Sequence, residues 1–112
     1  MRYSISCLSL ALLVYLTGAT PAQDEEKKTA KPDVQKGLAL AQRWCATCHV
    51  VSSEQSKGTD AAPSFQTVSK RADFNPEKLA FFLLDPHPLM PNMSLTRDEA
   101  RDITAYIARL RD

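Results

Sequence analysis

The chain has 112 residues, a length that allows one domain and leaves little room for a second. Its 14 basic residues almost balance its 13 acidic residues, so charge gives no reason to expect a nucleic acid or an anionic membrane as a partner. Strand-like alternation and internal repeats are absent from the sequence, whereas apolar residues recur at helical spacing. We therefore expect an all-α domain.

Residues 1–22 have the features of a signal peptide. Arg2 supplies a positive start, and the apolar run Ile5–Leu16 is too short to span a bilayer comfortably. Small residues follow, which places the expected cleavage after Ala22, with the bond after Ala19 as the alternative. We therefore expect export to the periplasm, with no stable membrane insertion once the leader is removed.

An uncleaved membrane anchor is the alternative to a signal peptide, but polar residues begin at Thr17 and a second apolar stretch does not follow. Cleavage would remove Cys7, so no structural disulfide would remain available outside the C-x-x-C pair. It would also remove one basic residue and leave 13 of each sign. Residues 23–31 are polar and charged, and they are predicted to be a flexible segment before the domain at 32–112.

The domain is expected to open with a helix that runs from Val34 into a cysteine motif, with Asp33 as its cap. Apolar residues recur along this helix at helical spacing. Gly37 lies beside the apolar stripe, where glycine would ordinarily cost about 1 kcal/mol. Close approach of another helix would explain it, and the last helix is the best candidate.

The first helix leads into Cys45-Ala46-Thr47-Cys48-His49, the C-x-x-C-H signature of c-type haem attachment. Thiols at positions i and i+3 of a helical turn lie on one face, so Cys45 and Cys48 can both reach the vinyl groups at one edge of a porphyrin. His49 is then placed to ligate the iron. A buried cysteine pair, a redox dithiol or half of a zinc site would use the thiols but leave the adjacent histidine unexplained. The motif predicts one haem c, covalently bound through Cys45 and Cys48.

A surface loop is expected from residue 50 to residue 62, followed by a short helix from Ser64 to about Lys70. Asn75 and Pro76 provide a cap and a first-turn proline for the next helix. This helix carries four large apolar residues in succession, at positions 81–84. Such a run suits an element enclosed between a cofactor and the rest of the core, although core packing alone would explain it almost as well.

Prolines at positions 86, 88 and 91 exclude a regular helix and stiffen the loop that carries His87 and Met90. The last helix is expected to start at Thr96, which has capping-box spacing to Glu99. Its apolar face extends to the end of the chain and consists of Ala100, Ile103, Tyr106, Ile107 and Leu110.

The second axial ligand of the iron has three candidates, which are Met90, Met93 and His87. Met90 is favoured because Leu89 and Pro91 flank it in the stiff loop, where its thioether can be held towards the haem. Met93 is the second choice, since a methionine is usually core filler. A histidine would lower the reduction potential, whereas a thioether raises it and suits one-electron transfer. A site without a second protein ligand is the remaining alternative.

Taken together, these residues resemble those of a small class I, single-domain, monohaem bacterial cytochrome c. The resemblance implies the cytochrome c fold, in which three to five helices surround one covalently bound haem and the first and last helices cross. It implies a contact between Tyr106 and Gly37, and a hydrogen bond from the His49 ring to the Pro63 carbonyl. The matching residues are Gly37, the motif at 45–49, Ala62-Pro63, Met90-Pro91, the helix start Leu95–Ala100 and Ala105-Tyr106-Ile107.

The function expected from this site is that of a periplasmic one-electron carrier between redox partner proteins, with His49 and Met90 as axial ligands. We do not expect an enzyme, since the sequence shows no separate acid and base constellation. One alternative is a haem enzyme or a gas-sensing cytochrome whose distal site is open or labile. The other is a fixed electron-transfer subunit of a larger oxidoreductase, such as a dehydrogenase complex. The sequence identifies neither the electron donor nor the acceptor.

Overall fold

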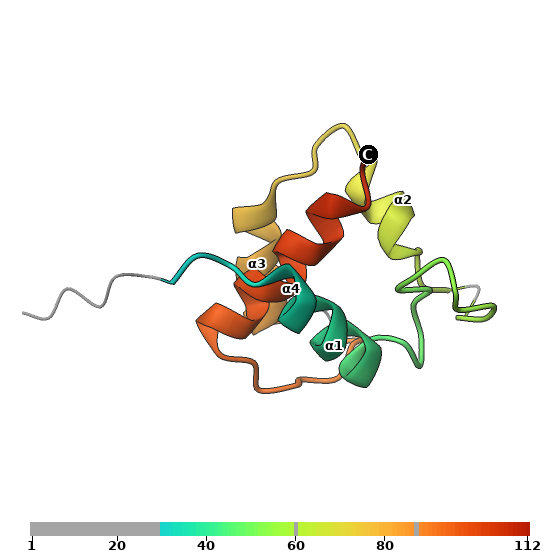
Figure 1. Cartoon of the computed structure of the whole chain (residues 1–112). Coiled ribbons are helices and arrows are strands. Elements are labelled where there is room, and N and C mark those ends of the chain that lie inside the picture. Colours follow the sequence, from blue (N-terminus) through green and yellow to red (C-terminus); the bar gives the residue numbers. More distant parts are fainter. Residues whose placement is uncertain (1–29, 60, 87) are drawn as a thin grey trace, which may run out of the picture.

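The computed structural model describes residues 30–59, 61–86 and 88–112. These ranges contain four helices and no strand, in the order α1 (Val34–Trp44), α2 (Phe65–Ser69), α3 (Pro76–Leu84) and α4 (Arg97–Arg109) (Figure 1). The prediction of an all-α domain with three to five helices is confirmed. None of the helices in the described ranges has the length and apolar content needed to cross a membrane. The predicted signal peptide, most of segment 23–31 and His87 lie outside the described residues.

Every helix begins at a polar side chain that accepts a hydrogen bond from a backbone N–H of its first turn, where an intrahelical partner is lacking. Three of these caps were predicted from the sequence. At α4 the capping box is complete, because the Thr96 side chain accepts from the Glu99 N–H and the Glu99 carboxylate accepts from the Thr96 N–H. The caps are Asp33, Ser64, Asn75 and Thr96.

Helices α1 and α4 cross at Gly37 (Figure 1). A Cβ atom built at Gly37 would collide with the Asp102 carbonyl and lie 3.0 Å from the Cβ of Tyr106. Glycine is therefore required by the closeness of the two backbones. The expected crossing of the first and last helices, with Tyr106 against Gly37, is confirmed.

The core lies between these two helices and α3, and the predicted apolar faces supply it. Ala41, Ala100 and Ile103 are completely buried, and Ile107 is nearly so. The burial of the Asp102 carboxylate, which belongs to α4, was not predicted from the sequence. Its Oδ1 accepts from the Asp33 backbone N–H at 2.7 Å, which fastens the start of α1 to the middle of α4.

Helix α3 differs from its prediction on one face. Leu83 is buried as expected, but Phe81 is 76% exposed and Phe82 is 41% exposed. One side of the helix packs against α4 and another side borders a cavity, and Phe81 lies on neither. The expectation that the apolar run would be enclosed around most of its circumference is therefore wrong at Phe81.

Candidate functional site

The cysteine motif forms the turn that follows α1, which ends at Trp44. The backbone N–H groups of Cys48 and His49 both donate to the Cys45 carbonyl, at 3.1 and 2.9 Å. The Cys45 thiol is buried, whereas Cys48 is exposed. Burial raises the pKa of Cys45 to about 11, so its thiol is protonated at neutral pH in the free chain. The turn thus directs the two thiols to different surroundings.

The His49 ring is fixed by the loop that precedes α2. Its Nδ1 lies 2.6 Å from the Pro63 carbonyl oxygen, as the sequence resemblance implied. Because a carbonyl can only accept, Nδ1 must carry the hydrogen in this contact. The neutral ring then keeps its free lone pair on Nε2, the nitrogen available to a metal. The Phe65 ring flanks the imidazole, with 5.4 Å between the ring centres.

A cavity of about 520 Å³ opens beside this turn, and its lining includes Cys45, His49, Pro63 and Met90. Four of the five predicted site residues therefore meet at one cavity. The fifth, Cys48, is exposed and is not part of the lining, and neither is Met93. Most of the other lining residues are apolar: Phe65, Val68, Phe74, Leu79, Phe82, Leu83 and Ile107.

The two methionines of the loop between α3 and α4 differ in their packing. Met90 is partly buried and packs against the core, whereas Met93 is partly buried but lies apart from it. Between Met93 and α4 the chain turns at Ser94, which has a φ of 51° in the left-handed region. The Asn92 side chain accepts the Ser94 N–H at 2.8 Å and stabilises this turn. The packing thus differs between Met90, the ligand that the sequence favoured, and Met93, its second choice.

Charged side chains at the cavity were not predicted from the sequence. Arg71, Asp73 and Lys78 belong to the lining. Arg71 donates to both carboxylate oxygens of Asp73, at 3.0 and 3.3 Å. These hydrogen bonds, together with the Arg71 charge, lower the pKa of Asp73 and keep it ionised. The sequence did contain one signal for these three residues, which is that they lie within four positions of Asn75, the cap of α3. Because α3 begins beside the cavity, charged residues near its start lie beside the cavity too.

The site fits a haem group in three respects. Its volume lies within the range of about 300–1,000 Å³ that is usual for cofactor sites, and its lining is mainly apolar. A thiol, an imidazole and a thioether converge on it, and the last two are the axial ligands of c-type cytochromes. The lining also carries two cations, of which Arg71 is already paired with Asp73, so Lys78 is the one that could meet a carboxylate of a porphyrin.

Comparisons with known proteins agree with this site. Residues 32–107 match the family described as cytochrome c oxidase, cbb3-type, subunit III. Cytochrome c-552 of Bradyrhizobium diazoefficiens is 57% identical over 79 residues, which make up 70% of this chain and 76% of that protein. A search of solved structures found no significant match. The chain therefore belongs to this family of cytochrome c domains, as a small class I cytochrome that carries one covalently bound haem c and serves as an electron carrier.

Proposed function

We propose that the protein is a periplasmic one-electron carrier whose haem c is attached through Cys45 and Cys48 and ligated by His49 and Met90. The observation that carries the proposal is the shared cavity of His49 and Met90, from which Met93 is absent. The hydrogen bond to the Pro63 carbonyl supports His49, since it occupies Nδ1 and leaves Nε2 as the nitrogen available to a metal. Attachment through Cys48 rests on the C-x-x-C-H motif.

The bound haem supplies the one-electron change between ferrous and ferric iron. The protein contributes the ligands and the surroundings that tune this change. Met90 would raise the reduction potential and close the site to small molecules, while the Pro63 carbonyl holds the His49 ring and increases its basicity. Lys78 would balance part of the negative charge of the haem carboxylates.

We propose that the site performs no substrate chemistry. Asp73 is the single carboxylate among the described residues of the lining, and its ion pair with Arg71 keeps it ionised. It is therefore poorly suited to act as a general acid near neutral pH.

Carbon monoxide binding separates the carrier from a haem enzyme or gas sensor. The reduced wild-type protein should bind the gas slowly or not at all, because the Met90 thioether occupies the position that the gas requires. Met90→Ala should bind it rapidly, and Met93→Ala should behave as the wild type. Voltammetry of the wild type should give a reversible one-electron wave. Rapid binding by the wild type would instead support a labile or open site.

The periplasmic location can be tested by the mass of the protein from the periplasmic fraction. Cleavage after Ala22 predicts a haem-bearing polypeptide that begins at Gln23. A full-length chain that remains with the membrane fraction would contradict the proposal.

A fixed subunit of a larger oxidoreductase is a second candidate, because the matching family is described as an oxidase subunit. Size-exclusion chromatography of a native periplasmic extract distinguishes the two. A free carrier should elute at the size of the monomer, whereas a subunit should elute with its complex.

A further inference from the structure

The side-chain amide of Gln55 connects several parts of the cysteine motif and the loop after it. Its Nε2 lies 2.9 Å from the Ala46 carbonyl oxygen, 2.8 Å from that of His49 and 2.7 Å from that of Lys57. Its Oε1 accepts the Val51 backbone N–H at 3.0 Å. One side chain thus contacts the motif at two points and the following loop at two more.

The partners determine which way this amide points. An amide nitrogen has two hydrogens and no acceptor, whereas the oxygen accepts only, so three carbonyls share the two N–H bonds of Gln55. In the reversed orientation the amide oxygen would face three carbonyl oxygens and the nitrogen would face an N–H group. The network therefore requires the amide nitrogen of Gln55, and not its oxygen, to face the His49 carbonyl.

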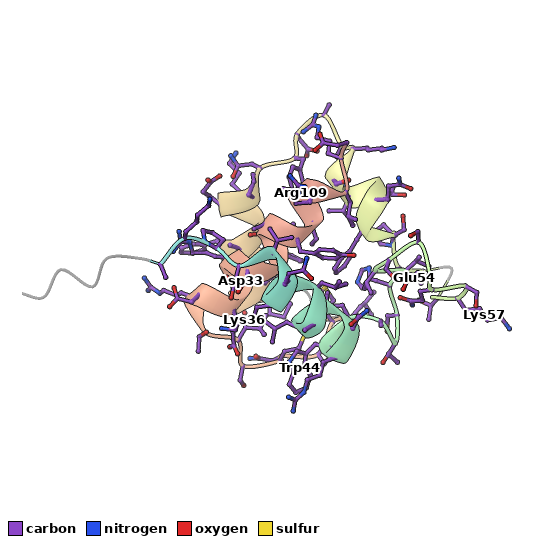
Figure 2. The ribbon with its side chains drawn as sticks, viewed as in Figure 1. Asp33, Lys36, Trp44, Glu54, Lys57 and Arg109 are labelled. Carbon is purple, nitrogen blue, oxygen red and sulfur yellow. The ribbon has the colours of Figure 1, made fainter. Side chains whose placement is uncertain are left out.

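The segment after Gln55 closes over the same backbone (Figure 2, where Glu54 and Lys57 mark the loop). The Thr59 N–H donates to the Cys48 carbonyl at 2.8 Å. A Cβ atom at Gly58 would lie 2.8 Å from the Cys48 carbonyl oxygen and 3.1 Å from the His49 carbonyl carbon. The backbone at Gly58 therefore lies very close to the backbone of the motif. The backbone of the motif is therefore held by residues 55–59, which do not belong to the cavity lining.

Helix α4 anchors this loop to the core. The Tyr106 hydroxyl donates to the Val51 carbonyl at 2.6 Å in a buried position. Burial, followed by the negative charge of Glu54, raises the pKa of Tyr106 and keeps this donor protonated. Val51, whose N–H donates to Gln55, is thus held to α4, the helix that crosses α1 at Gly37.

We propose that Gln55 is a positioning residue for the axial ligand: its amide holds the backbone of His49 and thereby sets the orientation of the imidazole over the iron. Pro63 fixes the ring at Nδ1, and Gln55 fixes the peptide from which the ring extends. The two contacts act at different ends of the residue, so loss of Gln55 would let the ring pivot about its Pro63 contact. The inference rests on the proposed ligation by His49.

The first test uses the wild-type haem protein in its reduced, diamagnetic form. Gln42 is the internal reference, because it borders the same surface hollow as Gln55 but is exposed, and its side chain makes no hydrogen bond to any residue that the structure describes. The side-chain amide protons of Gln55 should exchange with solvent at least about tenfold more slowly than those of Gln42. Equal exchange rates would overturn the proposal without any substitution that could affect folding.

The second test compares Gln55→Met with Gln42→Met in the oxidised haem protein. Methionine keeps the length of the side chain and removes the amide. Gln55→Met should shift the electron paramagnetic g values and the haem methyl proton resonances, which respond to the orientation of the axial imidazole, while Gln42→Met should leave both unchanged. Gln55→Glu keeps an acceptor for Val51 but removes both donors, and it should shift the same signals.

A merely structural role would lower the melting temperature of Gln55→Met and leave its g values and methyl resonances at the wild-type positions, which would overturn the proposal. His–Met ligation is read from the wild-type spectrum alone, whereas positioning is read from exchange rates and from differences between variants. Failure of the ligation and failure of the Gln55 role are therefore distinguishable.

Discussion

Replacement of Gly37 by alanine tests the packing that organises the domain. The substitution adds one methyl group at the point where α1 and α4 cross. In an exposed helix interior the change would stabilise the protein by about 1 kcal/mol, because alanine favours the helix more than glycine does. Here the methyl group would also lie 2.6 Å from the carbonyl carbon of Asp102, well inside the 3.4 Å at which ordinary contacts begin.

The packing cost should exceed the gain in helix propensity. The obstructing atoms belong to the backbone and cannot rotate away, so α4 must shift by about 1 Å, which loses a quarter to a half of the attraction between the contacting atoms. Overpacking of this kind costs about 1–3 kcal/mol, and the shift would also strain the hydrogen bond between Asp33 and Asp102. We expect a net loss of about 2 kcal/mol, or roughly 8–16 °C in melting temperature for a domain of this size.

Thermal unfolding of the haem protein, followed by circular dichroism, measures this loss. Ala39→Gly is the matched control, since Ala39 is exposed in the same helix and should lose only about 1 kcal/mol through helix propensity. A Gly37→Ala protein that melts at or above the wild-type temperature would refute the reasoning about the helix crossing.

Three further substitutions test charged groups outside the cavity. Asp102→Ala should lower the free energy of unfolding, measured in urea, by about 1–3 kcal/mol, because it leaves the Asp33 N–H unpaired. Lys36→Ala is the control and should cost less than about 1 kcal/mol, since Lys36 is half exposed. Equal losses would contradict this account. Hydrogen bonds from Thr96 lower the pKa of Glu99 below 4.5, so its stabilising effect is complete above that pH and is lost as the pH falls through the depressed value. The difference in melting temperature between wild type and Glu99→Gln should therefore shrink in acid, and a difference that stayed constant from neutral pH to well below 4.5 would show that this linkage is wrong.

The helices could be predicted from the sequence because their signals are local. Asp33, Asn75 and Thr96 each lie within three residues of the N–H groups that they cap. Gly37 was informative because glycine destabilises a helix interior, so its presence in α1 indicated a tertiary contact. That contact is the crossing with α4.

Other features depend on contacts that no local pattern encodes. Asp102 interrupts an apolar face, and its partner Asp33 lies 69 residues away. Gln55 belongs to a loop without periodicity, and its role becomes visible only when the motif folds back beside it. Phe81 was expected to be enclosed because it is apolar, but hydrophobicity alone does not show which side of α3 has a neighbour, and Phe81 is exposed. The sequence favoured Met90 over Met93 through its flanking residues, and the cavity lining, which includes Met90 and lacks Met93, agrees with that preference.

The near-infrared spectrum of the oxidised protein tests the central claim most directly. A thioether bound to ferric haem iron gives a charge-transfer band in this region, so the band reports the presence of a methionine ligand. We predict the band in the wild type and in Met93→Ala, and its loss in Met90→Ala. Absence of the band from the wild type, or its loss in Met93→Ala alone, would contradict the assignment of His49 and Met90 as the ligands of the iron.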